Sequence, residues 1–175
     1  MMRYNLRPIT IKDAVGFCDV FNTVSIESGF LVNGPLDKGY VPEVVEKSIS
    51  HWIEESDVYS NYVLDIEGDI VGVISVSPES MYLHKIKHIA NLCVVLKKSE
   101  RGYGYGELMV RHAIREAKRL GYRKLVLEVM STNTVAVNLY KKCGFEIYGI
   151  NKEGIKISDD LYDDIILMDI FLNKD

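Results

Sequence analysis

The chain has 175 residues, of which 47% are hydrophobic and 26% charged, and its formal net charge is −4 at pH 7. This length and composition are typical of a single globular domain, covering residues 1–175. The net negative charge argues against nucleic acid or an anionic membrane surface as the main partner. No apolar run reaches the length of a membrane span, and the first residues lack the apolar core of a signal peptide, so we expect a cytoplasmic protein.

The cysteines are odd in number and widely spaced, at Cys18, Cys93 and Cys143. A disulfide framework or a metal site needs cysteines that are paired or clustered. We therefore expect reduced thiols in or near the core, and no metal site. Cys93 lies in an apolar strand without a His partner nearby in the sequence, which favours an inert buried thiol over an acyl carrier.

The first part of the chain predicts one short strand and two helices. Residues 4–7 alternate in polarity, as a half-buried strand does. Thr10 with Asp13 three residues later forms an imperfect capping box, which predicts a helix start. The Asn-Gly-Pro turn signal at residues 33–35 leads to a second helix that begins near Pro42.

The middle of the chain predicts a three-stranded meander. Residues 62–66 and 70–76 are rich in strand-forming residues, and Glu-Gly-Asp at 67–69 joins them as a hairpin turn. Residues 86–96 form the third strand. The nearly continuous apolar run at its end indicates a central strand that is buried on both faces.

The last part predicts two helices and three strands. The helices are a long amphipathic one that ends before Gly121 and a short one at 134–142; the strands are 124–129, 145–150 and 161–171, with a polar, turn-like stretch at 152–160. The strand at 124–129 follows a strand and a helix, so it should pair in parallel with the third strand. The fold class is α/β (α+β), with a mixed, mostly antiparallel sheet of six or seven strands and about four helices.

A glycine-rich turn, Arg101-Gly102-Tyr103-Gly104-Tyr105-Gly106, separates the third strand from the long helix. Glycines at such a turn let backbone N–H groups approach an anion, which the helix dipole also favours. We therefore expect a phosphate-bearing cofactor. A dinucleotide site is excluded because no acidic residue ends the next strand, at residues 130–133. A kinase-type phosphate loop is excluded because no Gly-Lys-Ser/Thr follows the turn.

Two motifs follow each other along the chain: Arg101-x-x-Gly104-x-Gly106, then Asn133-x-x-Ala136-x-x-Leu139-Tyr140-x-x-x-Gly144-Phe145. Together they closely resemble the GCN5-related N-acetyltransferase (GNAT) superfamily, whose acetyl-CoA loop has the pattern Arg/Gln-x-x-Gly-x-Gly/Ala. The resemblance covers most of the chain, from residues 5–13 to residues 162–168. It implies the acyl-CoA N-acyltransferase fold and acetyl-CoA as cosubstrate, with no metal.

The resemblance also implies where acetyl-CoA binds. The third strand would part from its parallel neighbour, so that the pantetheine arm pairs with the backbone of Val94, Val95 and Leu96. Amides of the turn would hold the pyrophosphate; the turn residues are Arg101, Gly102, Tyr103, Gly104, Tyr105 and Gly106. The Asn133 amide would contact the cofactor arm, although a helix cap alone would also account for this residue. Asn138 is a further candidate contact.

Two residues are implied as catalytic. The Tyr140 hydroxyl would protonate the departing thiolate, and the alternative is an aromatic ring packed on the sheet. Glu128 matches the proton acceptor proposed for ribosomal-protein alanine acetyltransferases of this superfamily, and the alternative is an ordinary exposed strand position. His84, His88 or a water chain are competing bases. Asn91 stands where some relatives carry a catalytic Glu, which removes one candidate.

The predicted function is transfer of the acetyl group of acetyl-CoA to a primary amine, directly and in a ternary complex. The acceptor is a small-molecule or peptide amine, and neither nucleic acid nor membrane is expected as a partner. A homodimer is left open. The alternatives are a non-catalytic acyl-CoA-binding regulatory module of the same fold and an acyltransferase that uses another acyl-CoA.

Overall fold

The computed structural model describes residues 4–32 and 37–172. Its strands belong to one sheet in the order β1-β2-β3-β4-β5-β7-β6. The helices are α1 (Ala14–Glu27), α2 (Pro42–Glu54), α3 (Tyr105–Arg119) and α4 (Thr134–Lys142). The strands are β1 (Tyr4–Pro8), β2 (Ser60–Ile66), β3 (Asp69–Pro78), β4 (Ile89–Leu96), β5 (Lys124–Met130), β6 (Glu146–Ser158) and β7 (Leu161–Phe171). This confirms the predicted mixed sheet with four helices, in which β4 and β5 pair in parallel and the other neighbours are antiparallel.

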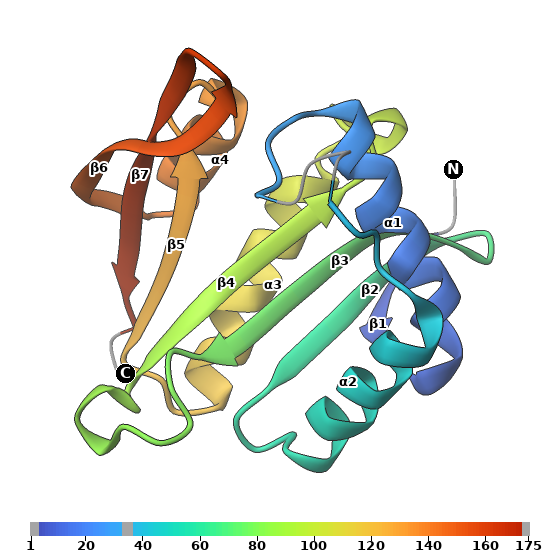
Figure 1. The fold of residues 1–175 in the computed structure, drawn as a ribbon. Coiled ribbons are helices and arrows are strands. Elements are labelled where there is room, and N and C mark those ends of the chain that lie inside the picture. Colours follow the sequence, from blue (N-terminus) through green and yellow to red (C-terminus); the bar gives the residue numbers. More distant parts are fainter. Residues whose placement is uncertain (1–3, 33–36, 173–175) are drawn as a thin grey trace.

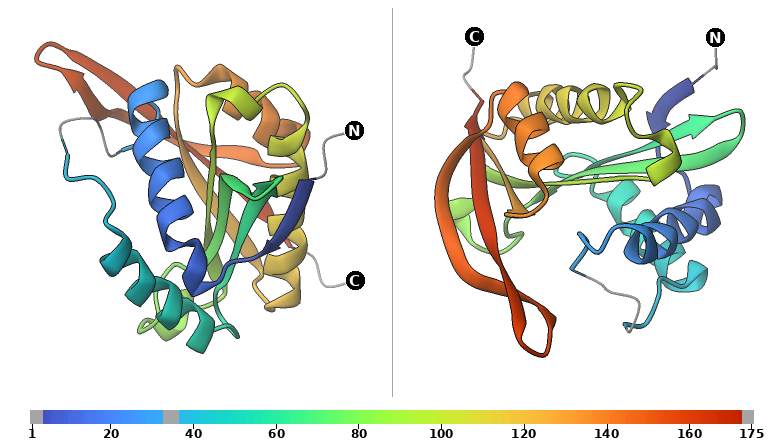
Figure 2. Two further views of the ribbon diagram at one scale, coloured as in Figure 1. Left: turned by 90° about the vertical axis from the view of Figure 1, so that its right-hand side faces the viewer. Right: turned by 90° about the horizontal axis from the view of Figure 1, so that it is seen from above.

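The sheet carries a hydrophobic core on each face. Helices α1 and α2 pack on one face of β2, β3 and β4, with Ile49 and Val63 fully buried between them. Helices α3 and α4 cover the other face, around Met109, Leu125 and Met168. Figure 2 shows this layering from above, with the hairpin of β6 and β7 curling toward the side of α1. No helix among the described residues is long and apolar enough to cross a membrane.

The two central strands stay together over a short distance only. Ile89, Ala90 and Asn91 of β4 pair with residues 124–126 of β5, and no later residues of the two strands pair. Beyond this point β4 remains paired with β3, and β5 with β7. The sheet therefore opens between β4 and β5, as Figure 1 shows.

Two predicted strand boundaries are wrong. We predicted that the third strand starts at Ile86, but β4 starts at Ile89, because the partner strand β3 ends at Pro78, opposite Ala90. We also predicted a polar turn at residues 152–160, whereas β6 continues to Ser158. Shifts in the β6–β7 register accommodate the polar residues within the ladder. The turn signal at residues 33–35 lies outside the described residues.

Candidate active site

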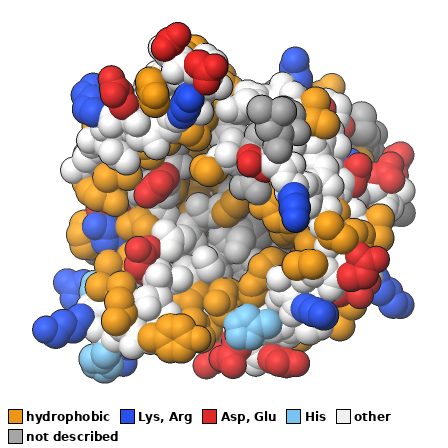
Figure 3. All heavy atoms as spheres, viewed as in Figure 1, with side chains coloured by type: hydrophobic (Ala, Val, Ile, Leu, Met, Phe, Trp, Pro, Cys, Tyr) orange, Lys and Arg blue, Asp and Glu red, His pale blue; other side chains and the backbone are white. Residues whose placement is uncertain are grey.

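The opening between β4 and β5 has a distinct set of side chains on the face that α3 and α4 leave uncovered. Side chains alternate between faces along a strand. Leu92 and Leu127 belong to the core under α3 and α4, so Cys93 and Glu128 point to the opposite face. Figure 3 shows a hollow in this face, with hydrophobic atoms around its floor and acidic side chains on the wall next to β5. This hollow is the candidate active site.

The glycine-rich turn lies at the open end of β4. Gly102 and Gly104 have φ angles of +86° and +85°, which favour glycine, and a Cβ on either would meet no atom within 4 Å. Helix α3 begins at Tyr105, and the first N–H groups of a helix have no acceptor within it. The open space above the glycines and the free helix amides fit a pyrophosphate group.

The Arg101 amide, which we predicted to bind the pyrophosphate, has a hydrogen-bond partner within the protein. Its N–H donates to the carbonyl of Lys98 at 3.2 Å, so this amide is already bound within the protein. The Arg101 guanidinium donates to the carbonyl of Leu96 from Nε at 3.2 Å and from Nη2 at 3.1 Å. Arg101 therefore ties the turn to the end of β4, and the amides that remain for a pyrophosphate belong to residues 102–106.

The other residues of the turn also have structural roles. A Cβ on Gly106 would lie 3.1 Å from Leu139 Cδ2, so glycine lets α3 approach α4. The Tyr105 ring meets the ring of Tyr4 edge-on, with 5.4 Å between centroids. Tyr103 is exposed at the surface, and its ring is tilted against that of Tyr105, with 6.2 Å between centroids.

The predicted pantetheine-binding strand is anchored on both faces. Val94 and Leu96 pack against the core under α3 and α4, whereas Val95 is buried under α1 and α2. The side chains are therefore occupied by packing. The part of this segment that faces the opening is its backbone edge, which β5 does not pair. This is the arrangement expected for recognition by main-chain hydrogen bonds.

Asn133 caps α4. Its Oδ1 accepts a hydrogen bond from the N–H of Ala136 at 3.3 Å, which confirms the helix-cap interpretation. The Asn133 Nδ2 group has no hydrogen-bond partner among the described residues and is available to a ligand. Asn138 lies on the exposed side of the same helix.

Tyr140 is partly buried and packs on the core, with its ring edge-on to Phe145 at 5.9 Å between centroids. Burial raises the pKa of the Tyr140 phenol, and negative charge on Cys93 or Cys143 would raise it further. The packing interpretation is therefore correct. The hydroxyl also stays protonated well into the alkaline range, as a proton donor requires.

The prediction that Cys93 is buried is wrong, because its side chain is exposed at the opening where β4 leaves β5. The surrounding protein still raises the pKa of its thiol to about 11, so the thiolate is scarce at neutral pH. Cys18 and Cys143 are buried, as predicted. No group of three or more His, Cys, Asp or Glu residues in the described part of the chain could hold a metal ion.

The candidate bases lie at different ends of the opening. Glu128 is exposed on the hollow face: its backbone lies in the β5–β7 ladder opposite Leu167, and its carboxylate has no hydrogen bond or ion pair with any described residue. His84 and His88 precede β4, at the end where the strands are still paired. Asn91 donates from Nδ2 to Glu79 Oε2 at 2.6 Å. Glu79 was not predicted from the sequence, because only the register of β3 against β4 brings it to Asn91.

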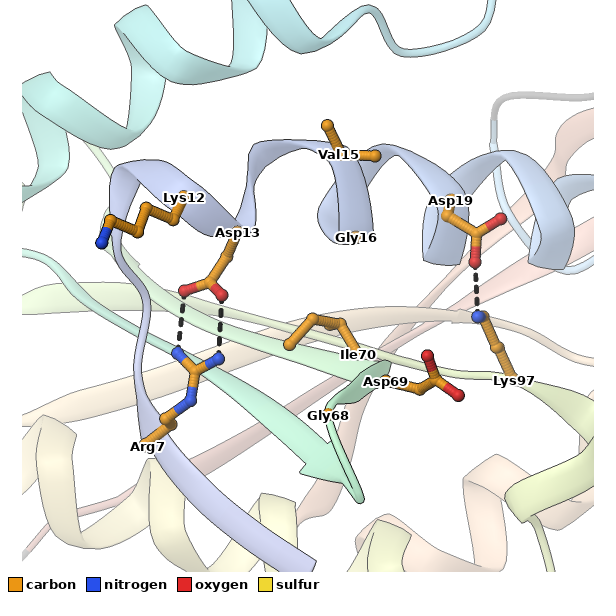
Figure 4. Close-up of a pocket in the computed structure, with 10 residues that line it drawn as sticks. All are labelled: Arg7, Lys12, Asp13, Val15, Gly16, Asp19, Gly68, Asp69, Ile70 and Lys97. Atoms are coloured by element: carbon orange, nitrogen blue, oxygen red, sulfur yellow. Dashed lines mark hydrogen bonds and ion pairs between the residues drawn. The ribbon is translucent and has the colours of Figure 1, made fainter.

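A separate cavity of about 320 Å³ lies between the start of α1 and the β2–β3 turn (Figure 4). Its charged groups are mostly paired with one another. Arg7 binds Asp13 at 2.8 Å and Asp65 at 3.1 Å, and the Lys97 ammonium pairs with Asp19. Neither Tyr140 nor Glu128 lines this cavity, so we assign the active site to the hollow between β4 and β5.

Comparisons with known proteins identify the family of this chain. The family described as "Acetyltransferase (GNAT) family" matches residues 33–145. An uncharacterized N-acetyltransferase of Escherichia coli K12, YjgM, is 23% identical over 141 residues, which is 81% of each chain. The structure of a GNAT-family acetyltransferase from Streptococcus pneumoniae superposes with a TM-score of 0.88 and 27% identity, covering 98% of this chain and 100% of that one.

A second structure, yncA from Salmonella typhimurium with its cofactor acetyl-CoA, superposes with a TM-score of 0.87, covering 99% of this chain and 96% of that one. It is 16% identical, so this likeness concerns the fold alone. The match to the family extends over more than half of the chain and includes the glycine-rich turn and Tyr140. The chain therefore belongs to the GNAT family of acetyltransferases.

Proposed function

We propose that this protein transfers the acetyl group of acetyl-CoA to a primary amine by direct transfer in a ternary complex. The observation that carries the proposal is the opening of the sheet after the Asn91–Val126 pair, with the free amides of residues 102–106 at its end. Family membership supports the acetyl group. The name of YjgM, an N-acetyltransferase, supports an amine as the acceptor.

The residues at the opening fit acetyl-CoA in a definite way. Amides of residues 102–106 bind the pyrophosphate, and the backbone edge of Val94, Val95 and Leu96 binds the pantetheine arm. The Asn133 amide and, further along α4, the exposed Asn138 side chain add polar contacts. Acetyl-CoA supplies the activated thioester. The protein supplies the alignment, which converts a reaction between two molecules into one within a complex.

Tyr140 is the proposed general acid. The packing of its ring against Phe145 holds the side chain in place, and its raised pKa means that the hydroxyl carries its proton at neutral pH. A positioned acid of this kind contributes about 10²- to 10⁴-fold to the rate.

Glu128 is the proposed proton acceptor. A primary amine is mostly protonated at neutral pH and has to lose a proton before it can attack. The Glu128 carboxylate faces the hollow, and no described residue neutralises it. It therefore attracts the cationic acceptor and then takes its proton, directly or through water.

The test is an assay of free thiol release from acetyl-CoA with a panel of amines: amino acids, diamines and peptides with a free N-terminus. Release that depends on both enzyme and amine supports the proposal. Binding of acetyl-CoA in calorimetry without release with any amine would instead favour a non-catalytic module. Faster thiol release from a longer acyl-CoA than from acetyl-CoA would favour an acyltransferase that uses another acyl-CoA.

A further inference from the structure

Asp163 on β7 is a buried carboxylate that is neither a candidate catalytic residue nor a candidate cofactor contact. It is 7% exposed, and no Lys or Arg of the described part of the chain pairs with it. Its Oδ1 accepts hydrogen bonds from Ser131 Oγ at 2.6 Å and from the N–H of Asp164 at 2.8 Å. Its Oδ2 accepts from Thr132 Oγ1 at 2.6 Å and from the N–H of Thr132 at 3.3 Å. Hydrogen bonds alone thus offset the cost of burying this charge.

The pattern of donors requires a carboxylate at this position. Each oxygen of Asp163 accepts one backbone N–H, and a backbone N–H cannot become an acceptor. An asparagine amide has one acceptor oxygen and one NH₂ group. Whichever way the amide turns, its NH₂ group faces a backbone N–H, of Thr132 or of Asp164. Replacement by asparagine therefore breaks one side of the network although the shape is kept.

The residues that Asp163 binds lead directly into the candidate active site. Ser131 and Thr132 connect β5 to α4, and the N–H of Ser131 also donates to the carbonyl of Asp164 at 2.8 Å. The next residue, Asn133, caps α4, which carries Tyr140. Figure 1 shows α4 beside the end of β5, where Met130 pairs with Ile165 in the first part of β7. One carboxylate on the β6–β7 hairpin thus fixes the start of the helix that bears the proposed acid.

We propose that Asp163 is a positioning residue: it holds the backbone of residues 131–133, and through them places the Asn133 amide and the Tyr140 hydroxyl at the opening between β4 and β5. Its effect on catalysis rests on the proposed function. Its effect on the backbone does not depend on any activity.

The first test is amide hydrogen exchange in Asp163→Asn without any ligand. We expect the amides of residues 131–136 to exchange at least about tenfold faster than in the wild type, with little change in β1, β2 and β3. Asp160→Asn is the matched control, because it removes the same charge from an exposed position at the tip of the same hairpin. Wild-type exchange at residues 131–136 in Asp163→Asn would overturn the proposal.

The second test is kinetic and separates positioning from general stability. The rate is divided by the number of acetyl-CoA binding sites, which calorimetry counts. We expect this kcat per site to fall by about tenfold in Asp163→Asn, and KM for the amine to change by less than about twofold. Thr132→Val removes one hydroxyl donor, and its effect should not add to that of Asp163→Asn, because both act on one network. Additive effects, or a normal kcat per site, would contradict a positioning role.

The two tests also distinguish this inference from the proposed function. If the wild type binds no acetyl-CoA and releases no thiol, the proposed function fails, while the exchange experiment still decides the role of Asp163. If Asp163→Asn does not fold, Ser131→Ala combined with Thr132→Val removes both hydroxyl donors and leaves the carboxylate in place. Faster exchange at residues 133–136 in this double variant supports the proposal, and unchanged exchange overturns it.

Discussion

Asn91 of β4 lies opposite Val126 of β5, and these are the last residues of the two strands that pair. Each strand continues beyond this pair with a partner on its other side only. An unpaired strand edge inside a sheet leaves N–H and C=O groups without the partners that a ladder would supply. The amide-containing arm of coenzyme A can supply such partners. In the proposed function, the acceptor amine would reach the same gap from the side of the hollow.

Gly104→Val should weaken acetyl-CoA binding by at least about tenfold, because a branched side chain is strained at positive φ and fills the space above the turn. Gly68→Val is the matched control. Gly68 also has a positive φ and open space around it, but it lies in the β2–β3 turn. Calorimetric titration of both variants checks the prediction, and equal affinities for acetyl-CoA would contradict it.

Tyr140→Phe should lower kcat by about 10²-fold or more while leaving the affinity for acetyl-CoA nearly unchanged, because it removes only the proton donor. Its raised pKa implies that the phenol stays protonated above its ordinary value of 10. Loss of the Tyr140 proton should therefore cause no fall in the wild-type rate below about pH 10. Any fall in that range should also occur in Tyr140→Phe. Tyr148→Phe, on the exposed surface of β6, is the control. An unchanged rate in Tyr140→Phe removes this residue from the mechanism.

Glu128→Gln should lower kcat/KM for the amine at neutral pH and lose less activity as the pH approaches the pKa of the acceptor amine. The reason is that the free amine, which needs no proton acceptor, becomes abundant there. Glu79→Gln, which changes the acidic residue bound to Asn91, should leave this pH dependence unchanged. If Glu128→Gln lowers kcat/KM by the same factor at every pH, Glu128 does not act as a base.

Protonation of the Asp13 carboxylate should make the fold less stable in acid. Burial alone would raise the pKa of Asp13, but hydrogen bonds from Arg7 and Thr10 outweigh it, so the net shift is downward. A lowered pKa contributes stability that is present above the unfolded value of about 3.9 and is lost as the pH falls through the folded pKa. Asp13→Asn should cost about 2 kcal/mol at neutral pH.

The measurement is urea unfolding of wild type and Asp13→Asn at neutral pH and below pH 3. The difference in unfolding free energy between the two proteins should shrink as the pH falls and the wild-type carboxyl becomes protonated. Asp159→Asn is the control and should have little effect, because Asp159 is exposed and its ion pair with Lys156 lies at the surface. A difference that stays constant with pH would contradict the assignment.

Local signals predicted the features that depend on a few neighbouring residues. The capping pair Thr10 and Asp13, the hairpin turn at 67–69 and the stop of α3 at Gly121 were all predicted, because turn and cap chemistry is set within a few residues. The parallel pairing of β4 with β5 also followed from the order of strand, helix and strand.

Features that depend on the register of distant strands were not predicted. The continuation of β6 past Asn151 depends on its shifted pairing with β7. No regular alternation of polar and apolar residues predicts a strand there. The exposure of Cys93 follows from the parting of β4 and β5. The network around Asp163 joins segments about thirty residues apart, so neither its donors nor its burial was visible in the sequence.

The most direct test of the central claim is amide hydrogen exchange with and without acetyl-CoA, read residue by residue. We predict that acetyl-CoA slows exchange at residues 92–96 of β4 and 102–106 of the turn, and leaves the cavity between α1 and the β2–β3 turn unaffected. No protection at those two segments, or protection confined to that cavity, would contradict the account.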